Sequence, residues 1–198
     1  MSRKSVVIIL AAGQASRMGR TKQLLQCDGK TLVQRALENA LSTNEPVLLV
    51  LGAKKDEIIP TIQGYLVNVV INENWANGIS SSLLVGVNSA LSTEPDLDGV
   101  LITLADQPHI TASHLKRILA AAANSRIIAT AYHGVQGVPV YIPKRYFQQL
   151  YQLIGDVGAK ALIEKNASQV KSIPFPAGAF DIDTEEDWKD FSEGRSPQ

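Results

Sequence analysis

Blocks of hydrophobic residues alternate with blocks of mixed polarity along the chain, and this pattern predicts strands separated by helices. Four short runs are apolar on both faces, as buried strands are: Ser5–Leu10, Pro46–Leu51, Asn68–Ile71 and Gly99–Leu104. The segments between them carry apolar residues at helical spacing: Thr31–Leu41, Lys54–Gln63 and Ser80–Leu91. Strands that alternate with helices predict an α/β fold, a Rossmann-like three-layer α/β/α sandwich with a mostly parallel sheet and right-handed crossovers.

The second half of the chain follows a less regular pattern. It predicts a helix over Thr111–Ala123 with Thr111 as N-cap, and strands over Ile127–Ala131 and Gly137–Ile142. Pro139, within the second of these strands, indicates an edge or hairpin position, and so a small antiparallel part of the sheet in the C-terminal half. Two more helices are expected, over Val157–Lys165 and over Thr184–Phe191, the latter opened by a pair like a capping box, Thr184 and Asp187.

Composition narrows the classes of protein that fit this pattern. A chain of 198 residues with 45% hydrophobic and 19% charged residues is ordinary for a globular protein, and we expect a single domain over 1–198 with its core at about 5–191. The 19 basic and 19 acidic residues cancel, so there is no overall positive field for nucleic acid or a membrane surface. The longest apolar runs are too short to span a bilayer, and the N-terminus lacks the cleavage site of a signal peptide. Together with a single cysteine, Cys27, best explained as a small residue near a turn, these features predict a cytoplasmic protein.

Three elaborate loops follow predicted strands, at Leu10–Leu25, Asn72–Ser82 and Ala105–Pro108. Ligands of open parallel sheets bind beyond the carboxyl ends of the strands, near the point where the strand order switches. We therefore expect these loops to form one ligand site.

The first loop combines glycines with cations, which is the chemistry needed to hold a polyphosphate. Gly13 and Gly19 allow close backbone approach, while Arg17, Arg20 and Lys22 place positive charges among exposed N–H groups. The spacing fits neither a Walker loop nor the dinucleotide fingerprint. The residues alone leave two alternatives, a phosphate cradle and a structural loop with solvated charges.

The second loop offers three hydroxyls, of Ser80, Ser81 and Ser82, at the start of a predicted helix. These hydroxyls and the free N–H groups of a first helical turn suit an anion or a sugar. The alternative is that one serine caps the helix and the others are solvated. An esterase elbow is excluded, because the second glycine of GxSxG is missing.

The third loop places a carboxylate, Asp106, at the end of an apolar strand. Such a charge is costly to bury unless it meets a cation or caps a helix. A second source of carboxylates is the segment FDIDTEED, where strand alternation puts Asp181 and Asp183 on one face. His109, His114 and His133 lack metal-ligand spacing, and surface or capping roles are expected for all three. Trp75 and Trp188 are expected to be packing residues.

These motifs together resemble the MobA-like NTP transferases, and within them most closely the molybdenum cofactor cytidylyltransferases. LAAGQASRMGRTKQLL resembles their signature loop LAAGxSxRMGxxKxLL, with Ala15 at the usual serine position and Ser16 beside Arg17. WANGISSSL resembles their WxxGxxxSL loop, LADQP their LAD(M/Q)P and DIDTEED their DIDTPED, with Glu185 at the proline. In the later part of the chain, GVPV resembles GxPV and GDVGAK resembles GDxGAR, with Lys160 in place of arginine.

The resemblance implies roles for individual residues. Arg17, Lys22 and Asp106 are the implied catalytic residues, and Asp106 with Asp183 would hold Mg²⁺, with Mn²⁺ as the alternative ion and Asp181 as the alternative ligand. The implied nucleotide-binding residues are Leu10, Ala11, Ala12, Gly13, Gly19, Gly78, Ser81 and Ser82. The implied acceptor-binding residues are Gly137, Pro139 and Asp156, although Asp156 has the alternative role of a helix cap.

The resemblance also implies a reaction. CMP from CTP would be transferred to the terminal phosphate of molybdopterin with release of pyrophosphate, and a molybdenum hydroxylase apoenzyme is an expected partner. CTP is preferred because Ala12 gives LAAG, whereas guanylyl relatives usually carry LAGG. The alternatives are a guanylyltransferase, a sugar-phosphate or alditol-phosphate nucleotidyltransferase, and a noncatalytic cofactor-insertion chaperone for such a hydroxylase.

Overall fold

A seven-stranded sheet with the order β5-β4-β1-β6-β8-β7-β9 forms the centre of the molecule. The structure is a computed structural model that describes residues 4–14, 18–122 and 126–194. Within this sheet, all strand pairs are parallel except β6–β8 and β8–β7, which confirms the predicted sheet with its small antiparallel part. The strands are β1 (Ser5–Ala11), β4 (Val47–Leu51), β5 (Asn68–Ile71), β6 (Gly99–Leu104), β7 (Ile127–Tyr132), β8 (Val135–Pro143) and β9 (Val170–Pro174).

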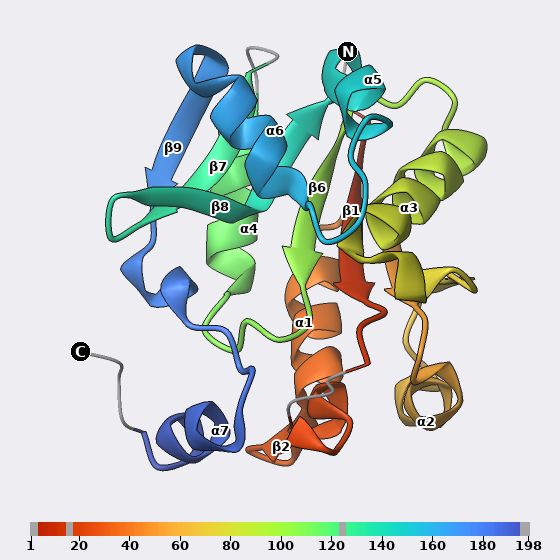
Figure 1. Cartoon of the computed structure of the whole chain (residues 1–198), viewed down its shortest axis with the longest axis vertical. Helices are drawn as coiled ribbons and strands as arrows, with labels where there is room; N and C mark the ends of the chain where they lie inside the picture. Colours follow the sequence, from red (N-terminus) through yellow and green to blue (C-terminus); the bar gives the residue numbers. More distant parts are fainter. Residues whose placement is uncertain (1–3, 15–17, 123–125, 195–198) are drawn as a thin grey trace.

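Helices cover both faces of this sheet, so the predicted three layers are confirmed (Figure 1). One face carries α1 (Leu32–Leu41), α2 (Lys55–Ile58) and α4 (Ala112–Ala121), and the other carries α3 (Ile79–Thr93), α5 (Phe147–Leu150) and α6 (Ala159–Lys165). In β1, Val7 and Ile9 pack into one core while Ile8 and Leu10 pack into the other. Because both faces are buried, the strand reads as an unbroken apolar run. Among the described residues, no helix is long and apolar enough to cross a membrane.

The side chains expected to begin helices do so. Thr111 precedes α4 and accepts a hydrogen bond from the His114 backbone N–H at 3.3 Å. Thr184 and Asp187 form a reciprocal capping box that opens α7 (Glu185–Ser192). Each cap satisfies N–H groups that the first helical turn leaves without partners, which fixes where the helix begins.

Pro139 was predicted to lie in an edge strand or in a hairpin, and the edge position is wrong. β8 forms the expected hairpin with β7 but lies inside the sheet, between β6 and β7. The β7–β8 register shifts between Ala129 and Thr130, so that Val138 and Pro139 stand opposite no residue of β7. This bulge accommodates the proline, because no ladder hydrogen bond is required from the missing N–H.

Several short elements were not predicted or differ from prediction. The segment expected as one helix over 54–63 is α2 followed by a 3-10 turn, η3 (Ile59–Ile62), because Pro60 removes a backbone donor. A hairpin of β2 (Gln26–Cys27) and β3 (Lys30–Thr31) turns at Asp28 and Gly29, whose φ angles are 54° and 77°. Asp-Gly is a recognisable signal for such a turn, and Cys27 lies beside it as expected. The other 3-10 turns given for the described part of the chain are η2 (Lys22–Leu24), η4 (Trp75–Asn77), η6 (Lys144–Tyr146), η7 (Ala167–Gln169) and η8 (Pro176–Ala179).

The C-terminal segment returns to the N-terminal loop. Phe180 and Ile182 join Met18, Leu25 and Leu32 in a third hydrophobic cluster, and α7 lies near β2 in Figure 1. The Ile182 N–H donates to the Asp106 carbonyl at 3.0 Å. These contacts bring the aspartates on either side of Ile182 to the carboxyl edge of the sheet.

Candidate functional site

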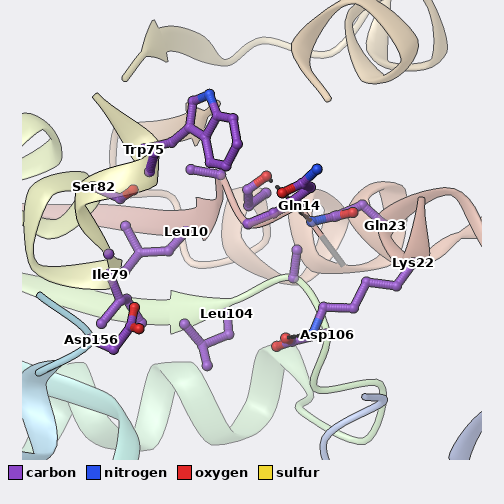
Figure 2. A pocket seen from close by; sticks show the side chains of 16 residues that line it. Leu10, Gln14, Lys22, Gln23, Trp75, Ile79, Ser82, Leu104, Asp106 and Asp156 are labelled. Carbon is purple, nitrogen blue, oxygen red and sulfur yellow. Dashed lines mark hydrogen bonds and ion pairs between the residues drawn. The ribbon is translucent and has the colours of Figure 1, made fainter. Parts of the chain in front are cut away.

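A cleft of about 410 Å³ opens at the carboxyl ends of β1 and β6 (Figure 2). Its walls come from the β1 end and the loop that follows, η2, the η4–α3 junction, the end of β6 and the loop before α6. β1 lies between β4 and β6, so the cleft occupies the switch point of the strand order. Its volume is within the range of small-molecule sites, roughly 300–1,000 Å³.

Lys22 is the electrostatic centre of this cleft. Its Nζ lies 2.5 Å from Asp106 Oδ2 and 2.9 Å from Asp183 Oδ1, and Figure 2 shows the side chain reaching to Asp106. Burial of Lys22 opposes its charged form, but the two carboxylates outweigh burial and raise the pKa of the ammonium. Lys22 is therefore a cation held between two anions, and it supplies the partner that Asp106 was expected to need.

Two carboxyl groups near Lys22, those of Asp106 and Asp181, are perturbed by burial. Asp106 Oδ1 is buried and has no hydrogen-bond partner among the described residues. Asp181 keeps solvent-accessible surface, yet the surrounding protein removes part of its hydration, and this burial, with repulsion from Asp106, raises the pKa of its carboxyl group to about 6. Within the described ranges, no cluster of three or more His, Cys, Asp or Glu side chains forms a metal site of protein ligands alone.

A glutamine fixes the backbone of the first loop. Gln23 is 2% exposed, and its Nε2 donates to the carbonyls of Ala11 at 3.4 Å and Gly13 at 3.3 Å. The Ala53 N–H donates to the Ala12 carbonyl at 3.1 Å. With these carbonyls engaged, the loop after β1 is held from both sides before any ligand binds.

The serine loop is organised by hydrogen bonds among its own residues. Asn72 Nδ2 donates to Ser81 Oγ at 2.8 Å and to Ser82 Oγ at 2.9 Å, and Ser81 Oγ donates to the Gly78 carbonyl at 2.8 Å. α3 begins at Ile79 with Gly78 as N-cap. The alternative in which a serine caps this helix is therefore wrong.

One family profile covers most of the chain, including all the residues that line the cleft. The sequence profile of the MobA-like NTP transferase domain matches residues 7–170, which include the first loop, the serine loop and Asp106. The chain belongs to the MobA-like NTP transferase family. It is thus a member of a family of nucleotidyltransferases.

Three relatives illustrate the spread of this MobA-like family. Nicotine blue oxidoreductase of Paenarthrobacter nicotinovorans is 29% identical over 81% of this chain and 75% of its own length. Molybdenum cofactor cytidylyltransferase of Escherichia coli K12 is 27% identical over 73% of each chain. The crystal structure of Rv0371c from Mycobacterium tuberculosis matches with a TM-score of 0.83 and 26% identity over 98% of this chain and all of that one. A manganese complex of Rv0371c matches with a TM-score of 0.79 and 24% identity over 96% and 98% of the two chains.

The structure brings most of the residues predicted for a MobA-like site into the cleft. Those lining it are Leu10, Ala11, Ala12, Gly13, Lys22, Gly78, Ser82, Asp106 and Asp156. Gly19, Ser81, Pro139 and Asp183 are not among the lining residues, although Asp183 reaches the site through Lys22. Gly137 lines a second, adjoining pocket. Arg17 lies outside the described residues, together with Ala15 and Ser16, so its predicted role stays a prediction.

The structure changes the role expected of Arg20 and excludes one of the two roles left open for Asp156. Arg20, expected among the cations of the phosphate cradle, donates to both carboxylate oxygens of Glu185 at 2.7 and 2.6 Å. Glu185, which stands at the proline position of the DIDTPED pattern, thereby ties the first loop to α7. Asp156 is not a helix cap, since the N-cap of α6 is Gly158, and its side chain lies at the cleft (Figure 2).

The expectation of surface or capping roles for all three histidines is wrong for two of them. His114 is 1% exposed, and its ring stacks on Phe175 with centroids 4.2 Å apart. His109 is half-buried against Phe180 and Phe191. His133 is exposed in the β7–β8 turn, as expected. The spacing of apolar residues in α4 indicates which face of the helix is buried. It does not show that the His114 ring on that face finds a buried hydrogen-bond partner, Thr130.

The sequence did not identify several residues of the cleft. Gln14, Gln23 and Trp75 line it, and Asn72 organises its serines. Trp75 was expected only to pack, whereas its indole stands at the wall of the cleft (Figure 2). Asn72 could have been suspected as a site residue because it directly follows a predicted strand. Nothing in the sequence around Gln23, which lies inside the KQLL segment, indicates its role in the cleft.

Substitution of Gly78 by alanine is expected to disrupt the junction of the serine loop with the loop before α6. Gly78 has a φ of +89°, and a Cβ there would overlap the backbone of Gly155, whose carbonyl accepts a hydrogen bond from Ser80 N–H at 3.1 Å. We expect Gly78→Ala to lower the free energy of unfolding by about 2–4 kcal/mol, measured by urea denaturation.

Gly64→Ala is the matched control, because Gly64 has a φ of +91° but nothing within 4 Å of its Cβ position. It should carry only the backbone strain, about 1–2 kcal/mol. Equal losses in the two variants would show that contact with Gly155 does not restrict position 78.

Proposed function

We propose that this chain transfers CMP from CTP to the terminal phosphate of molybdopterin and releases pyrophosphate. The observation that carries the proposal is the Lys22 ammonium held between Asp106 and Asp183 at the mouth of a cleft beyond β1 and β6. A cation flanked by carboxylates at this edge suits a polyphosphate that arrives with a divalent ion.

The charges of the site fit a divalent cation. Among the described charged side chains that line the cleft, Lys22 is positive while Asp106 and Asp156 are negative. Asp181 and Asp183 nearby add negative charge, so a bare triphosphate would be repelled. Mg²⁺ prefers oxygen ligands and takes one or two carboxylates together with phosphate oxygens. The buried Asp106 Oδ1, which has no partner among the described residues, is such an oxygen. Asp106 and Asp183 would hold the ion, with Asp181 as the alternative, and the manganese complex of Rv0371c supports a divalent metal.

The chain's own residues would act by positioning and by charge. The backbone of the first loop, held by Gln23, would carry the nucleotide, and Lys22 would neutralise the β- and γ-phosphates with Arg17, its predicted partner. A phosphate oxygen of the acceptor attacks the α-phosphorus in line, forming the new P–O bond as the bond to pyrophosphate breaks. The nucleophile is already anionic, so no protein base is needed. A metal bound at Asp106 would supply positive charge beside the transferring phosphoryl group.

An apolar pocket of about 150 Å³ adjoins the cleft and offers a surface on which the face of a flat acceptor ring can pack. It shares Leu10, Ile79 and Leu104 with the cleft, so a ligand in one can reach the other. Gly137 and Val138 of β8 form part of its wall. We place the acceptor here, with its phosphate directed to the cleft past Asp156.

The preference for CTP rests on the first loop and on one relative. The Ala12 methyl is 5% exposed and faces Gly52, where an added Cβ would lie only 2.9 Å from it. Ala12 also lines the cleft, and we propose that its methyl disfavours the larger purine base there. The cytidylyltransferase of Escherichia coli, 27% identical, supports the same base.

Pyrophosphate release with molybdopterin and each of the four ribonucleoside triphosphates tests the proposal. We expect CTP to be used at least about tenfold better than GTP, corresponding to about 1.4 kcal/mol of discrimination. Ala12→Gly should narrow that ratio, because it removes the methyl that excludes the larger base. Preference for GTP would make the protein a guanylyltransferase, and turnover with a sugar or alditol phosphate but not with molybdopterin would reject the acceptor.

Binding of nucleotide without release of pyrophosphate would favour the noncatalytic alternative, a cofactor-insertion chaperone for a molybdenum hydroxylase. Equilibrium dialysis with radiolabelled CTP and Mg²⁺ measures that binding independently of turnover. The two measurements together separate a transferase from a nucleotide sensor.

A further inference from the structure

A chain of buried hydrogen bonds connects α4 to the bulge in β8. His114 Nε2 lies 2.9 Å from Thr130 Oγ1, and Thr130 Oγ1 donates to the Pro139 carbonyl at 2.7 Å. His114 is 1% exposed and Thr130 is fully buried. The cleft residues described above take no part in these contacts.

The direction of the hydrogen bonds fixes the protonation of the histidine. A carbonyl can only accept, so the single hydroxyl proton of Thr130 goes to Pro139, and Thr130 must accept from His114. His114 Nε2 therefore carries the proton, and the buried Nδ1 has no partner among the described residues. Burial and the nearby Arg117 lower the pKa of His114 to about 4, which keeps this neutral form at physiological pH.

These hydrogen bonds end at the Pro139 carbonyl oxygen, which pairs with no neighbouring strand of the sheet. β8 pairs with β6 as far as Val140 and resumes pairing with β7 at Gly137, so Val138 and Pro139 form the bulge. Gly137 and Val138 line the 150 Å³ pocket, beside Tyr132. A Cβ on Gly137 would overlap the Tyr132 hydroxyl, so this wall has little room to move. Displacement of the bulge would change the shape of the pocket directly.

We propose that His114 and Thr130 are positioning residues that set the acceptor pocket through the Pro139 carbonyl, without touching either substrate. This inference rests on the proposed function in that it assigns the pocket to the acceptor. The nucleotide side of the cleft is built from β1, η2 and α3. The hydrogen bonds of His114 and Thr130 do not reach these elements. Loss of these hydrogen bonds therefore weakens binding of the acceptor substrate but leaves binding of the nucleotide unchanged.

The test is a steady-state comparison of Thr130→Val and His114→Leu with the wild type, using CTP and molybdopterin. Thr130→Val removes both buried hydrogen bonds and His114→Leu removes one of them. Loss of the bond to the Pro139 carbonyl in Thr130→Val should raise KM for molybdopterin about tenfold, while KM for CTP stays within about twofold. Thr130→Ser and His114→Gln keep a hydroxyl and an N–H donor at these positions and should restore a nearly normal KM. An unchanged KM for molybdopterin in folded Thr130→Val, or an equal rise for both substrates, would overturn the inference.

Phe175→Leu is the matched control for general loss of stability. It removes the ring that stacks on His114 but leaves the three hydrogen-bonding groups intact. It should lower the melting temperature without raising KM for molybdopterin. If it raises that KM as much as Thr130→Val does, the effect comes from destabilisation, and the positioning role is rejected.

Amide hydrogen exchange separates failure of this inference from failure of the proposed function. Peptides covering 135–143 should exchange faster in Thr130→Val than in the wild type or Thr130→Ser, while peptides covering 99–104 should not. If the wild type transfers no nucleotide to molybdopterin, the proposed acceptor is wrong, yet faster exchange confined to the bulge still supports its anchoring by Thr130. Unchanged exchange there would reject the anchoring whatever the substrate.

Discussion

Asp106→Asn is expected to lower the rate of metal-dependent pyrophosphate release by about 10³-fold or more, because one preorganised charge at a transferring phosphoryl group contributes on that order. The substitution keeps the shape of the side chain and removes its negative charge. Lys22 keeps Asp183 as an ion-pair partner, so the fold should survive. Initial rates over a series of Mg²⁺ concentrations measure the loss, and thermal unfolding checks the fold.

Asp98→Asn is the matched control for Asp106→Asn, since the two aspartates flank opposite ends of β6. Asp98 is exposed and accepts a hydrogen bond from the Lys4 N–H, far from the cleft. Its substitution should leave turnover unchanged. Comparison of Asp183→Asn with Asp181→Asn then assigns the second carboxylate, and the larger loss is expected at Asp183. Turnover by Asp106→Asn within tenfold of the wild type would remove Asp106 from the metal site.

The layers of the fold could be predicted because burial on both faces leaves a continuous signal. β1, β5 and β6 begin where the apolar runs begin, and the caps at Thr111 and Thr184 lie where their residue types place them. The position of β8 could not be predicted, because a proline indicates only that ladder hydrogen bonds are absent. A bulge inside a sheet satisfies that condition as well as an edge does.

The members of the site could be predicted one by one, but their pairing could not. Lys22 and Asp106 stood out as charges after apolar strands, yet nothing local shows that they bind each other or share Asp183. That pairing depends on the third hydrophobic cluster, which brings the C-terminal segment to the first loop. Arg20 shows the same limit, since a cation in a phosphate-like loop can be engaged by Glu185 from a distant helix.

Lys22→Met should weaken catalysis and change how the protein responds to Mg²⁺. Methionine keeps the aliphatic stem, so the loss is mainly the positive charge, and we expect kcat/KM for the nucleotide to fall about 10²–10³-fold. Without the ammonium, Asp106 and Asp183 face each other without their shared cation. The side chains of Lys22, Asp106 and Asp183 are 12%, 20% and 38% exposed, so partial solvation limits the loss of stability to about 1–2 kcal/mol.

Mg²⁺ should restore the stability that Lys22→Met loses. An ion that binds only the folded state raises the free energy of unfolding of the protein. In the wild type the Lys22 ammonium already neutralises the two carboxylates, and a metal must compete with it for their oxygens. The shift in melting temperature on adding MgCl₂ is therefore expected to be larger in Lys22→Met than in the wild type. Lys55→Met, which breaks an exposed ion pair with Glu73, should show no such gain. If Mg²⁺ stabilises all three proteins equally, the Lys22 ammonium and the metal do not compete for Asp106 and Asp183. Lys22 would then have to bind the phosphates of the nucleotide while it keeps its ion pairs with these two carboxylates.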